Sequence, residues 1–251
     1  MAPTERIERI SNWIKDYAEK HKVESLVVGV SGGIDSAVVS TLCALTGIQT
    51  FVLSMPIRQA DDQHDRSVDH CLKLLERFPN VHWETIHLTK VFEQFEQLFP
   101  ANNKLALANS RSRLRMITLY QVAQENNGIV VGTGNKVEDF GVGFFTKYGD
   151  GGVDISPIAD LTKTQVRELA RELGVNQEII DAPPTDGLWE DGRSDEDQIG
   201  ATYEELEWAM EYKSGNITER QKKVLEIYNR FHNQNKHKME PIPIFKYETN
   251  N

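Results

Sequence analysis

The chain has 251 residues and a formal net charge of −10, and 39% of its residues are hydrophobic. Such acidity argues against a general nucleic-acid binder, because phosphate backbones require a basic surface. The polar N-terminus shows no signal-peptide pattern, no apolar run is long enough to span a membrane, and Cys43 and Cys71 fall in helix-like contexts. We therefore expect a cytoplasmic protein with a sizeable core and no disulfides.

Strand and helix patterns alternate along the first half of the chain. An amphipathic helix over residues 7–17 precedes a strand over residues 26–30. Further strands are expected over 48–54, 81–88 and 129–131, and further helices over 37–45, around a face of Val68, Cys71, Leu72 and Leu75, over 91–99 and over 103–126. This alternation predicts an α/β fold, a mostly parallel sheet with helices on both faces.

The second half is expected to be richer in loops. Residues 140–154 hold five glycines and are predicted to form a loop, and a helix capped by Thr162 or Thr164 ends at Leu173. A long proline- and glycine-containing loop is expected over 182–192. Two helices follow, over 203–213 and 218–233, before a tail from residue 235.

The segment that joins the first strand to the next helix is the most informative stretch, Gly-Val-Ser-Gly-Gly-Ile-Asp-Ser at 29–36. Its adjacent glycines permit a tight turn, and the free N–H groups and positive dipole of the following helix favour an anion. Asp35 would repel a phosphate unless a divalent cation bridges the two. The segment therefore predicts a phosphate-binding loop with a metal, although it matches neither G-x-x-x-x-G-K-[ST] nor G-x-G-x-x-G.

This Ser-Gly-Gly-x-Asp-Ser run resembles the pyrophosphate-binding loop of the ATP pyrophosphatase superfamily, whose members split ATP between the α and β phosphates. Other motifs are similar to those of one family within it, the NAD synthetases, from about residue 5 to residue 242. They are Gly-Phe-Phe-Thr-Lys-Tyr-Gly-Asp-Gly-Gly at 143–152, Asn109 to Met116, Leu161 to Gln165, Ala182 to Leu188, Asp195-Glu196, Ile199-Gly200 and His237-Lys238. The resemblance implies a Rossmann-like, adenine nucleotide alpha hydrolase-like fold.

The family resemblance implies an ammonia-dependent ligase that makes NAD in the last step of its biosynthesis. ATP adenylates the nicotinate carboxylate of deamido-NAD and releases pyrophosphate, and ammonia then displaces AMP. It also implies Mg²⁺ and a homodimer that binds substrate across its interface, with the opening helix and residues 113–120 as candidate contacts. We expect one domain over 1–251, with a nucleotide-binding core in 1–160 and a helical part with binding loops in 161–251.

Glutamine-dependent members of the family carry a nitrilase-like domain for which this chain has no room. A glutaminase needs an activated cysteine, and neither Cys43 nor Cys71 has an evident base near it in the sequence. We therefore expect free ammonia as the nitrogen donor, while a separate amidotransferase partner stays open.

Residue by residue, the resemblance implies that Asp35 and Lys163 are catalytic and that Asp35 and Glu138 bind the metal. ATP would contact Gly29, Val30, Ser31, Gly32, Gly33, Ile34, Asp35, Ser36, Thr133, Lys163 and Thr185. Deamido-NAD would contact Arg113, Lys147, Asp154, His237 and Lys238, the last two from the same chain or from a dimer partner. Taken alone, Arg113 is expected to be a surface charge rather than a ligand contact, whereas Lys163 in a first helical turn opposes the helix dipole and thereby favours a functional role.

Two segments depart from the family pattern. The common bacterial form Gly-Thr-Asp-His-Ala-Ala-Glu-Ala is replaced by residues 132–139, and one extra residue precedes the Phe-Phe pair. Because Glu138 keeps its spacing, we expect metal binding to survive and the helix between to differ. Residues 58–70 match the family's adenosine-side loop poorly and are assigned no contacts.

Alternative functions remain open at this point. The chain resembles other superfamily members, such as a GMP synthetase ATPase domain or a tRNA-thiolating enzyme, although acidity and two cysteines argue against the latter. A non-catalytic adenine-nucleotide sensor would use the same sheet without a second substrate. Pyrophosphate release measured with and without deamido-NAD and ammonium separates these alternatives.

Overall fold

A single parallel sheet organises the molecule. The structure, a computed structural model, describes residues 1–59, 61–101, 103–185 and 194–247. Within these ranges the sheet has the strand order β3-β2-β1-β4 and every pair is parallel. The strands are β1 (Ser25–Gly29), β2 (Gln49–Ser54), β3 (Val81–Thr85) and β4 (Gly128–Val130). The predicted parallel sheet is confirmed, with strand ends shifted by a few residues.

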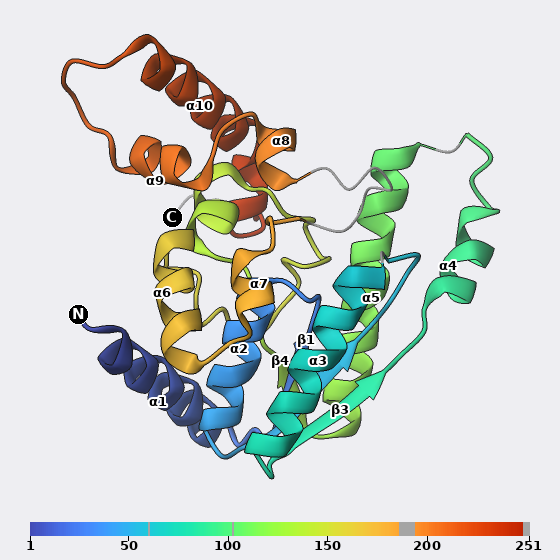
Figure 1. Ribbon diagram of the computed structural model, residues 1–251. Helices are drawn as coiled ribbons and strands as arrows, with labels where there is room; N and C mark the ends of the chain where they lie inside the picture. Colours follow the sequence, from blue (N-terminus) through green and yellow to red (C-terminus); the bar gives the residue numbers. More distant parts are fainter. Residues whose placement is uncertain (60, 102, 186–193, 248–251) are drawn as a thin grey trace.

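Helices cover both faces of this sheet, as predicted (Figure 1). Leu26 and Val28 of β1 pack in a core with α1, α2 and α6, whereas Val27 points to the other face and packs with α5. The bounds are α1 (Pro3–His21), α2 (Ile34–Leu45), α3 (Asp61–Arg77), α4 (Thr89–Glu96), α5 (Lys104–Glu125) and α6 (Lys163–Leu173).

Local capping signals explain where two of these helices begin and end. The Asn103 side chain accepts a hydrogen bond from the amide of Ala106 and starts α5, which ends before Asn126 as the sequence predicted. Thr162, one of the two predicted alternatives, caps α6 in a reciprocal capping box with Gln165. Gly174, at φ 72°, ends α6 in the left-handed conformation.

The buried face of α3 differs from the prediction. Leu72 and Leu75, expected on the core face with Val68 and Cys71, are 45% and 39% exposed. Cys71 is buried as predicted, and beside it the helix buries Ser67 and His70, whose side chains bond to Ser54 and Ser40. These polar partners lie on other elements, so the face of α3 that packs on the sheet is not the face with the most apolar residues.

The second half of the chain holds more helix than predicted. Val137–Val142 form a π-helical segment, η1, so the predicted loop over 140–154 is wrong at its start. The short helices α7 (Gln177–Asp181) and α8 (Asp195–Ile199) were not expected, and the predicted loop over 182–192 falls largely outside the described residues.

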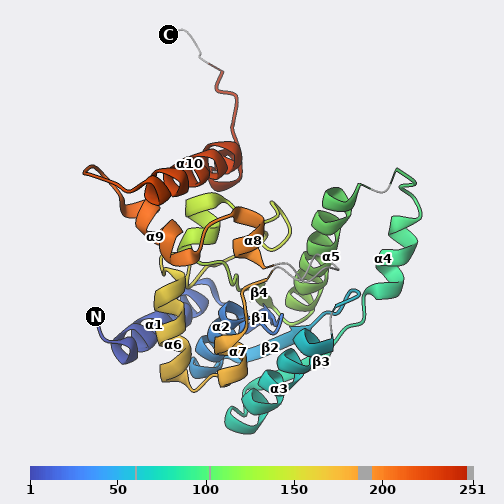
Figure 2. The same ribbon diagram turned by 45° about the horizontal axis from the view of Figure 1, so that its top comes forward.

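The predicted pair of C-terminal helices is confirmed as α9 (Tyr203–Glu211) and α10 (Glu219–Met239). Helix α10 continues beyond residue 233, so His237 and Lys238 lie on a helix and not in a tail. Helices η1, α9 and α10 share a small core of their own and lie together at one end of the molecule (Figure 2). Within the described residues, no helix is both long and apolar enough to cross a membrane.

Candidate active site

A cavity of about 680 Å³ lies beyond the carboxyl end of β1. All eight residues of the loop 29–36 line it, together with residues from β4, α5, η1, α6 and α10. Ligands of open parallel α/β sheets bind at this edge, where the loops that follow the strands converge. The sheet therefore brings segments that are distant in the sequence to one hollow.

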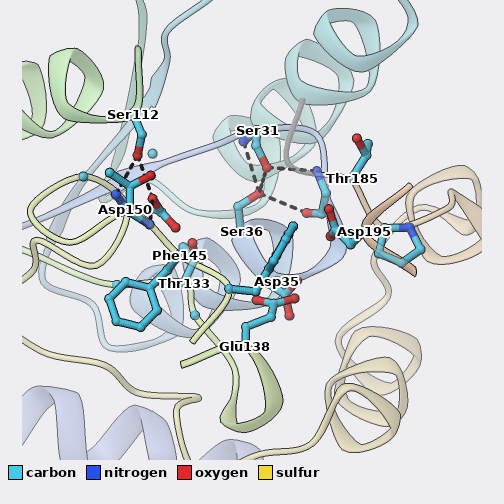
Figure 3. A pocket seen from close by; sticks show the side chains of 18 of the residues that line it. Ser31, Asp35, Ser36, Ser112, Thr133, Glu138, Phe145, Asp150, Thr185 and Asp195 are labelled. Carbon is cyan, nitrogen blue, oxygen red and sulfur yellow. Dashed lines mark hydrogen bonds between the residues drawn. The ribbon is translucent and has the colours of Figure 1, made fainter. Parts of the chain in front are cut away.

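The loop 29–36 is closed by its own hydrogen bonds (Figure 3). The Ser31 amide donates to Ser36 Oγ at 3.2 Å, Ser36 Oγ donates to the Gly33 carbonyl at 2.9 Å, and the Gly33 amide donates to Ser31 Oγ at 3.2 Å. Gly32 has φ +84°, and a Cβ there would overlap the Gln63 carbonyl. Helix α2 starts at Ile34 without a side-chain cap, so its first amides stay available to an anion.

A buried cluster of three charged side chains lies next to this loop. Lys163, 3% exposed, places its Nζ 2.5 Å from Asp35 Oδ2 and 3.1 Å from Glu138 Oε1. Tyr203 donates its hydroxyl to Glu138 Oε1 at 2.5 Å, and Asn135 donates to Asp35 at 3.3 Å. The starts of α2, α6 and α9, with η1, thus fix one cation between two carboxylates.

Burial and pairing act in opposite directions within this cluster. Burial raises the pKa of Asp35, against the attraction of Lys163. Burial also disfavours ionised Glu138, but the charge of Lys163 and the hydrogen bonds from Tyr203 and Lys163 lower the pKa of Glu138 overall. For Lys163, burial is outweighed by the two carboxylates, which raise its pKa. Lys163 is therefore charged, and Glu138, with its second donor, is the more acidic of the two carboxyl groups.

The donor set of Asp35 and Glu138 suits a magnesium ion. Their carboxylate oxygens already converge on one cation, the Lys163 ammonium group. Mg²⁺ is commonly bound by one or two carboxylates together with substrate phosphates. In the described part of the chain no group of three or more His, Cys, Asp or Glu side chains is placed to hold a metal, so water and phosphate oxygens would complete the coordination.

The opposite wall of the cavity is the glycine-rich segment 143–152, which is fixed to α5. Ser112 Oγ donates to Asp150 Oδ1 at 2.6 Å, and the Thr146 amide donates to the same oxygen at 3.0 Å. Thr146 Oγ1 in turn bonds to Asn109 at 2.8 Å. Burial raises the pKa of Asp150. These contacts make the segment an ordered wall rather than a flexible surface turn.

Three cations of this wall are held by backbone carbonyl groups. Arg113 donates to the Lys147 carbonyl at 3.2 Å, and Lys147 Nζ donates to the His237 carbonyl at 3.0 Å. Lys238 Nζ donates to the Phe145 carbonyl at 2.7 Å, and burial lowers the pKa of Lys238. Within the described ranges none of these three pairs with a carboxylate, so their charge is available to an anionic ligand.

The segment that departs from the family pattern has a local explanation. Residues 137–142, just before Phe144-Phe145, form the π-helix η1, in which the backbone hydrogen bonds span one residue more than in an α-helix. The Asp139 carboxyl group lies over Gly134, where any Cβ would overlap it. Burial and the neighbouring carboxylates raise the pKa of Asp139 to about 8.

Most of the predicted site residues meet at the cavity. Besides the loop, it is lined by Arg113, Thr133, Glu138, Lys147, Lys163, Thr185, His237 and Lys238. Asp154 is not among the lining residues: its carboxylate accepts hydrogen bonds from the Val130 amide at 2.8 Å and from Tyr120 Oη at 3.1 Å. Asp154 thus ties β4 to α5.

Sequence reasoning missed several residues of the site. Asn135 and Tyr203 contact the charged cluster, and Gln59 donates to the Ser31 carbonyl at 3.0 Å from a region that was assigned no contacts. Asp150 belongs to the quoted Gly-Asp-Gly-Gly motif, which was a usable signal. Tyr203 carried none, because its partner Glu138 is distant in the sequence and an aromatic residue at a helix start is ordinarily core.

The fold and the site together define a nucleotide-binding α/β protein with the Rossmann-like fold of the ATP pyrophosphatases. Residues 6–242 match the family described as NAD synthase. The chain belongs to the NAD synthase family, and the predicted membership is confirmed.

Individual relatives match over almost their whole length. An NH₃-dependent NAD⁺ synthetase from Alkaliphilus metalliredigens is 39% identical over 95% of this chain and 97% of its own. The solved NMN synthetase from Francisella tularensis is 34% identical with a TM-score of 0.89, covering 98% of this chain and 100% of that chain. The solved NAD⁺ synthetase from Burkholderia pseudomallei is 27% identical with a TM-score of 0.72, covering 95% and 90%.

Proposed function

We propose that the chain joins ammonia to the nicotinate carboxyl group of deamido-NAD at the expense of ATP, which completes the biosynthesis of NAD. One observation carries this proposal: the loop 29–36 and Lys163 share a single cavity with the cations Arg113, Lys147 and Lys238. A phosphate-binding loop that faces a second cationic wall allows two nucleotides to meet in a reactive orientation. Membership of the NAD synthase family supports the same reaction.

The reaction consists of two substitutions. A carboxylate oxygen of the substrate first bonds to the α-phosphorus of ATP, the bond from that phosphorus to the bridging oxygen breaks, and pyrophosphate leaves with the electron pair. The nitrogen of ammonia then bonds to the carbonyl carbon, AMP leaves with the electrons of the C–O bond, and the nitrogen loses a proton. Adenylation supplies the leaving group that a free carboxylate lacks.

The loop stabilises the charge that grows on the departing pyrophosphate. We assign this role to the first amides of α2, to the hydroxyls of Ser31 and Ser36, and to Lys163 and Thr185, all of which line the cavity. Donors that are already oriented toward developing charge lower the barrier without reorganisation. We assign Thr133 to ATP as well, from the end of β4.

Asp35 and Glu138 are the residues that would hold Mg²⁺, on the strength of their convergent oxygens. A bound magnesium ion supplies positive charge to phosphate oxygens. Asp35 also lies in the first turn of α2, so it is positioned by the same loop that binds the phosphates.

Deamido-NAD is assigned to the cationic wall formed by Arg113, Lys147 and Lys238, together with the neighbouring His237. These side chains come from α5, the segment 143–152 and α10, and all are present on one chain. Asp154 stays a prediction for this substrate, and its contacts with Val130 and Tyr120 support a structural role instead.

Ammonia is the proposed nitrogen source. Both cysteines are buried: burial raises the pKa of Cys71 to about 12 and raises that of Cys43 further. A buried thiol with a raised pKa supplies no thiolate nucleophile for glutamine hydrolysis. Neither cysteine is thus suited to act as a glutaminase nucleophile, which supports ammonia as the nitrogen donor.

An NAD-formation assay tests the proposal. We expect activity with ATP, Mg²⁺, deamido-NAD and ammonium chloride, little activity with glutamine, and near-complete loss for Asp35→Ala. Pyrophosphate should appear only when deamido-NAD is present. Pyrophosphate release without deamido-NAD, or full activity of Asp35→Ala, would contradict the assignment.

A second candidate is amidation of the corresponding mononucleotide, giving NMN. It is favoured by the likeness to the Francisella tularensis NMN synthetase, which spans both chains almost completely. Both substrates present the same nicotinate carboxyl group, and the dinucleotide adds an AMP moiety for the cationic wall. A competition assay with equal concentrations of deamido-NAD and the mononucleotide acid decides between the two candidates. The acid that is amidated faster has the higher kcat/KM and is the preferred substrate.

We further propose a homodimer that acts in the cytoplasm. Large apolar side chains on α5 and in the segment between α4 and α5 are exposed, among them Leu98 at 71%, Leu105 at 59% and Ile117 at 59%. Burying such a surface against a second copy would stabilise the pair. Two unpaired cysteines suit a reducing compartment. Sedimentation velocity should give twice the chain mass, and Ile117→Lys should shift it toward the monomer.

A further inference from the structure

Lys163 occupies the point between the two carboxylates that we assign to the metal. Its Nζ bonds to both Asp35 and Glu138, and its side chain is 3% exposed. The ammonium group also lies 4.7 Å from the centre of the Tyr203 ring, whose hydroxyl bonds to Glu138. The negative charge of the two acids is thus partly compensated by a cation of the same chain.

This arrangement and a bound metal exclude one another. A divalent cation at the same oxygens would be repelled by an ammonium group only a few ångströms away. If the ammonium group left with nothing in its place, two buried carboxylates would be uncompensated, which is strongly destabilising. Lys163 can therefore leave only when another cation arrives and when new negative charge receives the ammonium group.

The cavity offers such a destination. The loop 29–36, with its free helix amides, borders Asp35, and Thr185 lies on the same cavity wall. Phosphates bound there would add negative charge within reach of a flexible lysine side chain. The nucleotide phosphates would then bind the ammonium group of Lys163, and the metal would take its place between the two carboxylates in the same step.

We propose that Lys163 is a resident counter-cation of the metal site, which blocks the metal until nucleotide phosphates draw its ammonium group away. The metal and the nucleotide then bind together and not one after the other. This inference rests on the proposed assignment of Asp35 and Glu138 to the metal. The inference predicts that the protein binds the metal only weakly when no nucleotide is present.

Binding of Mn²⁺, a spectroscopic substitute for Mg²⁺, tests the proposal without catalysis. The probe is the electron paramagnetic resonance signal of free Mn²⁺, titrated with full-length protein in the absence of nucleotide. We expect Lys163→Met to bind one Mn²⁺ per chain at least about tenfold more tightly than the wild type, because a like charge has been removed. Lys136→Met is the matched control, since Lys136 is near Glu138 in the chain but pairs with Asp160 at 3.0 Å. It should bind Mn²⁺ as the wild type does.

Equal Mn²⁺ affinity of Lys163→Met and the wild type would overturn the proposal. If Lys163→Met does not fold, Lys163→Gln, which keeps a hydrogen-bonding group without the charge, replaces it. A thermal unfolding measurement on the wild type is a second test. If Mn²⁺ raises the melting temperature of the nucleotide-free wild type, and Asp35→Asn abolishes this rise, then Lys163 does not block the metal site. NAD formation is measured separately, so the reaction can fail while the Mn²⁺ result stands, and the reverse.

Discussion

Helix α2 carries two buried polar clusters that differ in charge. Its first turn holds Asp35, which pairs with Lys163 beside the cavity. Its middle holds Ser40, whose Oγ lies 2.9 Å from His70 Nε2 and donates to the Ser36 carbonyl at 2.7 Å. His70 is 4% exposed, and burial lowers its pKa to about 4, so this second cluster is neutral at pH 7.

The difference separates packing from function. The cluster of Ser40 and His70 satisfies its polar atoms with neutral groups, as the interior of a stable domain requires. The cluster of Asp35, Glu138 and Lys163 buries three charges, although apolar side chains of similar volume would often be at least as stable. Charges retained at such a site, next to a cavity, indicate a ligand that needs them.

The largest effect is expected from the charged cluster. Glu138→Gln should lower NAD formation by about 100-fold or more, because it removes one of two proposed metal ligands and half of the partners of Lys163. Steady-state kinetics over a range of Mg²⁺ concentrations measure the change. Glu226→Gln, on the exposed face of α10, is the control and should retain full activity. Unchanged kinetics of Glu138→Gln would place the metal elsewhere.

A smaller effect is expected from the hydroxyl that holds Glu138. Tyr203→Phe keeps the buried ring but removes the donor to Glu138, so the Mg²⁺ concentration for half-maximal activity should rise about tenfold, the value of one hydrogen bond to a charged group. The maximal rate at saturating Mg²⁺ should change less. Tyr212→Phe removes a hydroxyl that donates to the Gly215 carbonyl, away from the charged cluster, and serves as the matched control. A loss of stability without a shift in Mg²⁺ dependence would make Tyr203 purely structural.

The neutral cluster should affect stability alone, and only in acid. Because the pKa of His70 falls to about 4 in the folded chain, the unfolded chain takes up a proton that the folded chain refuses. The stability is fully present above about pH 6.5 and is lost as the pH falls toward 4. Between pH 7 and pH 4.5 the wild type should lose about 2 kcal/mol more than His70→Gln.

Urea unfolding at the two pH values measures this difference. His87→Gln, an exposed histidine, should behave like the wild type. Activity at pH 7.5 should be the same for His70→Gln and the wild type. A change in activity there would mean that the neutral cluster also acts on the cavity and would erase the contrast with the charged one.

The two regions also differ in how far the sequence predicted them. The loop 29–36 and the capped ends of α5 depend on neighbouring residues, so the local pattern was sufficient. The predicted core face of α3 was wrong at Leu72 and Leu75, because Ser67 and His70 are buried and satisfied by partners on other elements. Tyr203 was missed for the same reason, since only the fold brings it to Glu138. Local chemistry was predictable, and long-range polar pairing was not.

The π-helical turn η1 has a consequence for how Glu138 is held. Phe144, just beyond the end of η1, donates its amide to the Glu138 carbonyl at 2.9 Å. The turn between them presents Phe140 to solvent, where that side chain is 49% exposed. We therefore expect substitutions at Phe140 to leave the position of Glu138 unchanged, because the backbone that carries Glu138 is fixed from the other side of the turn.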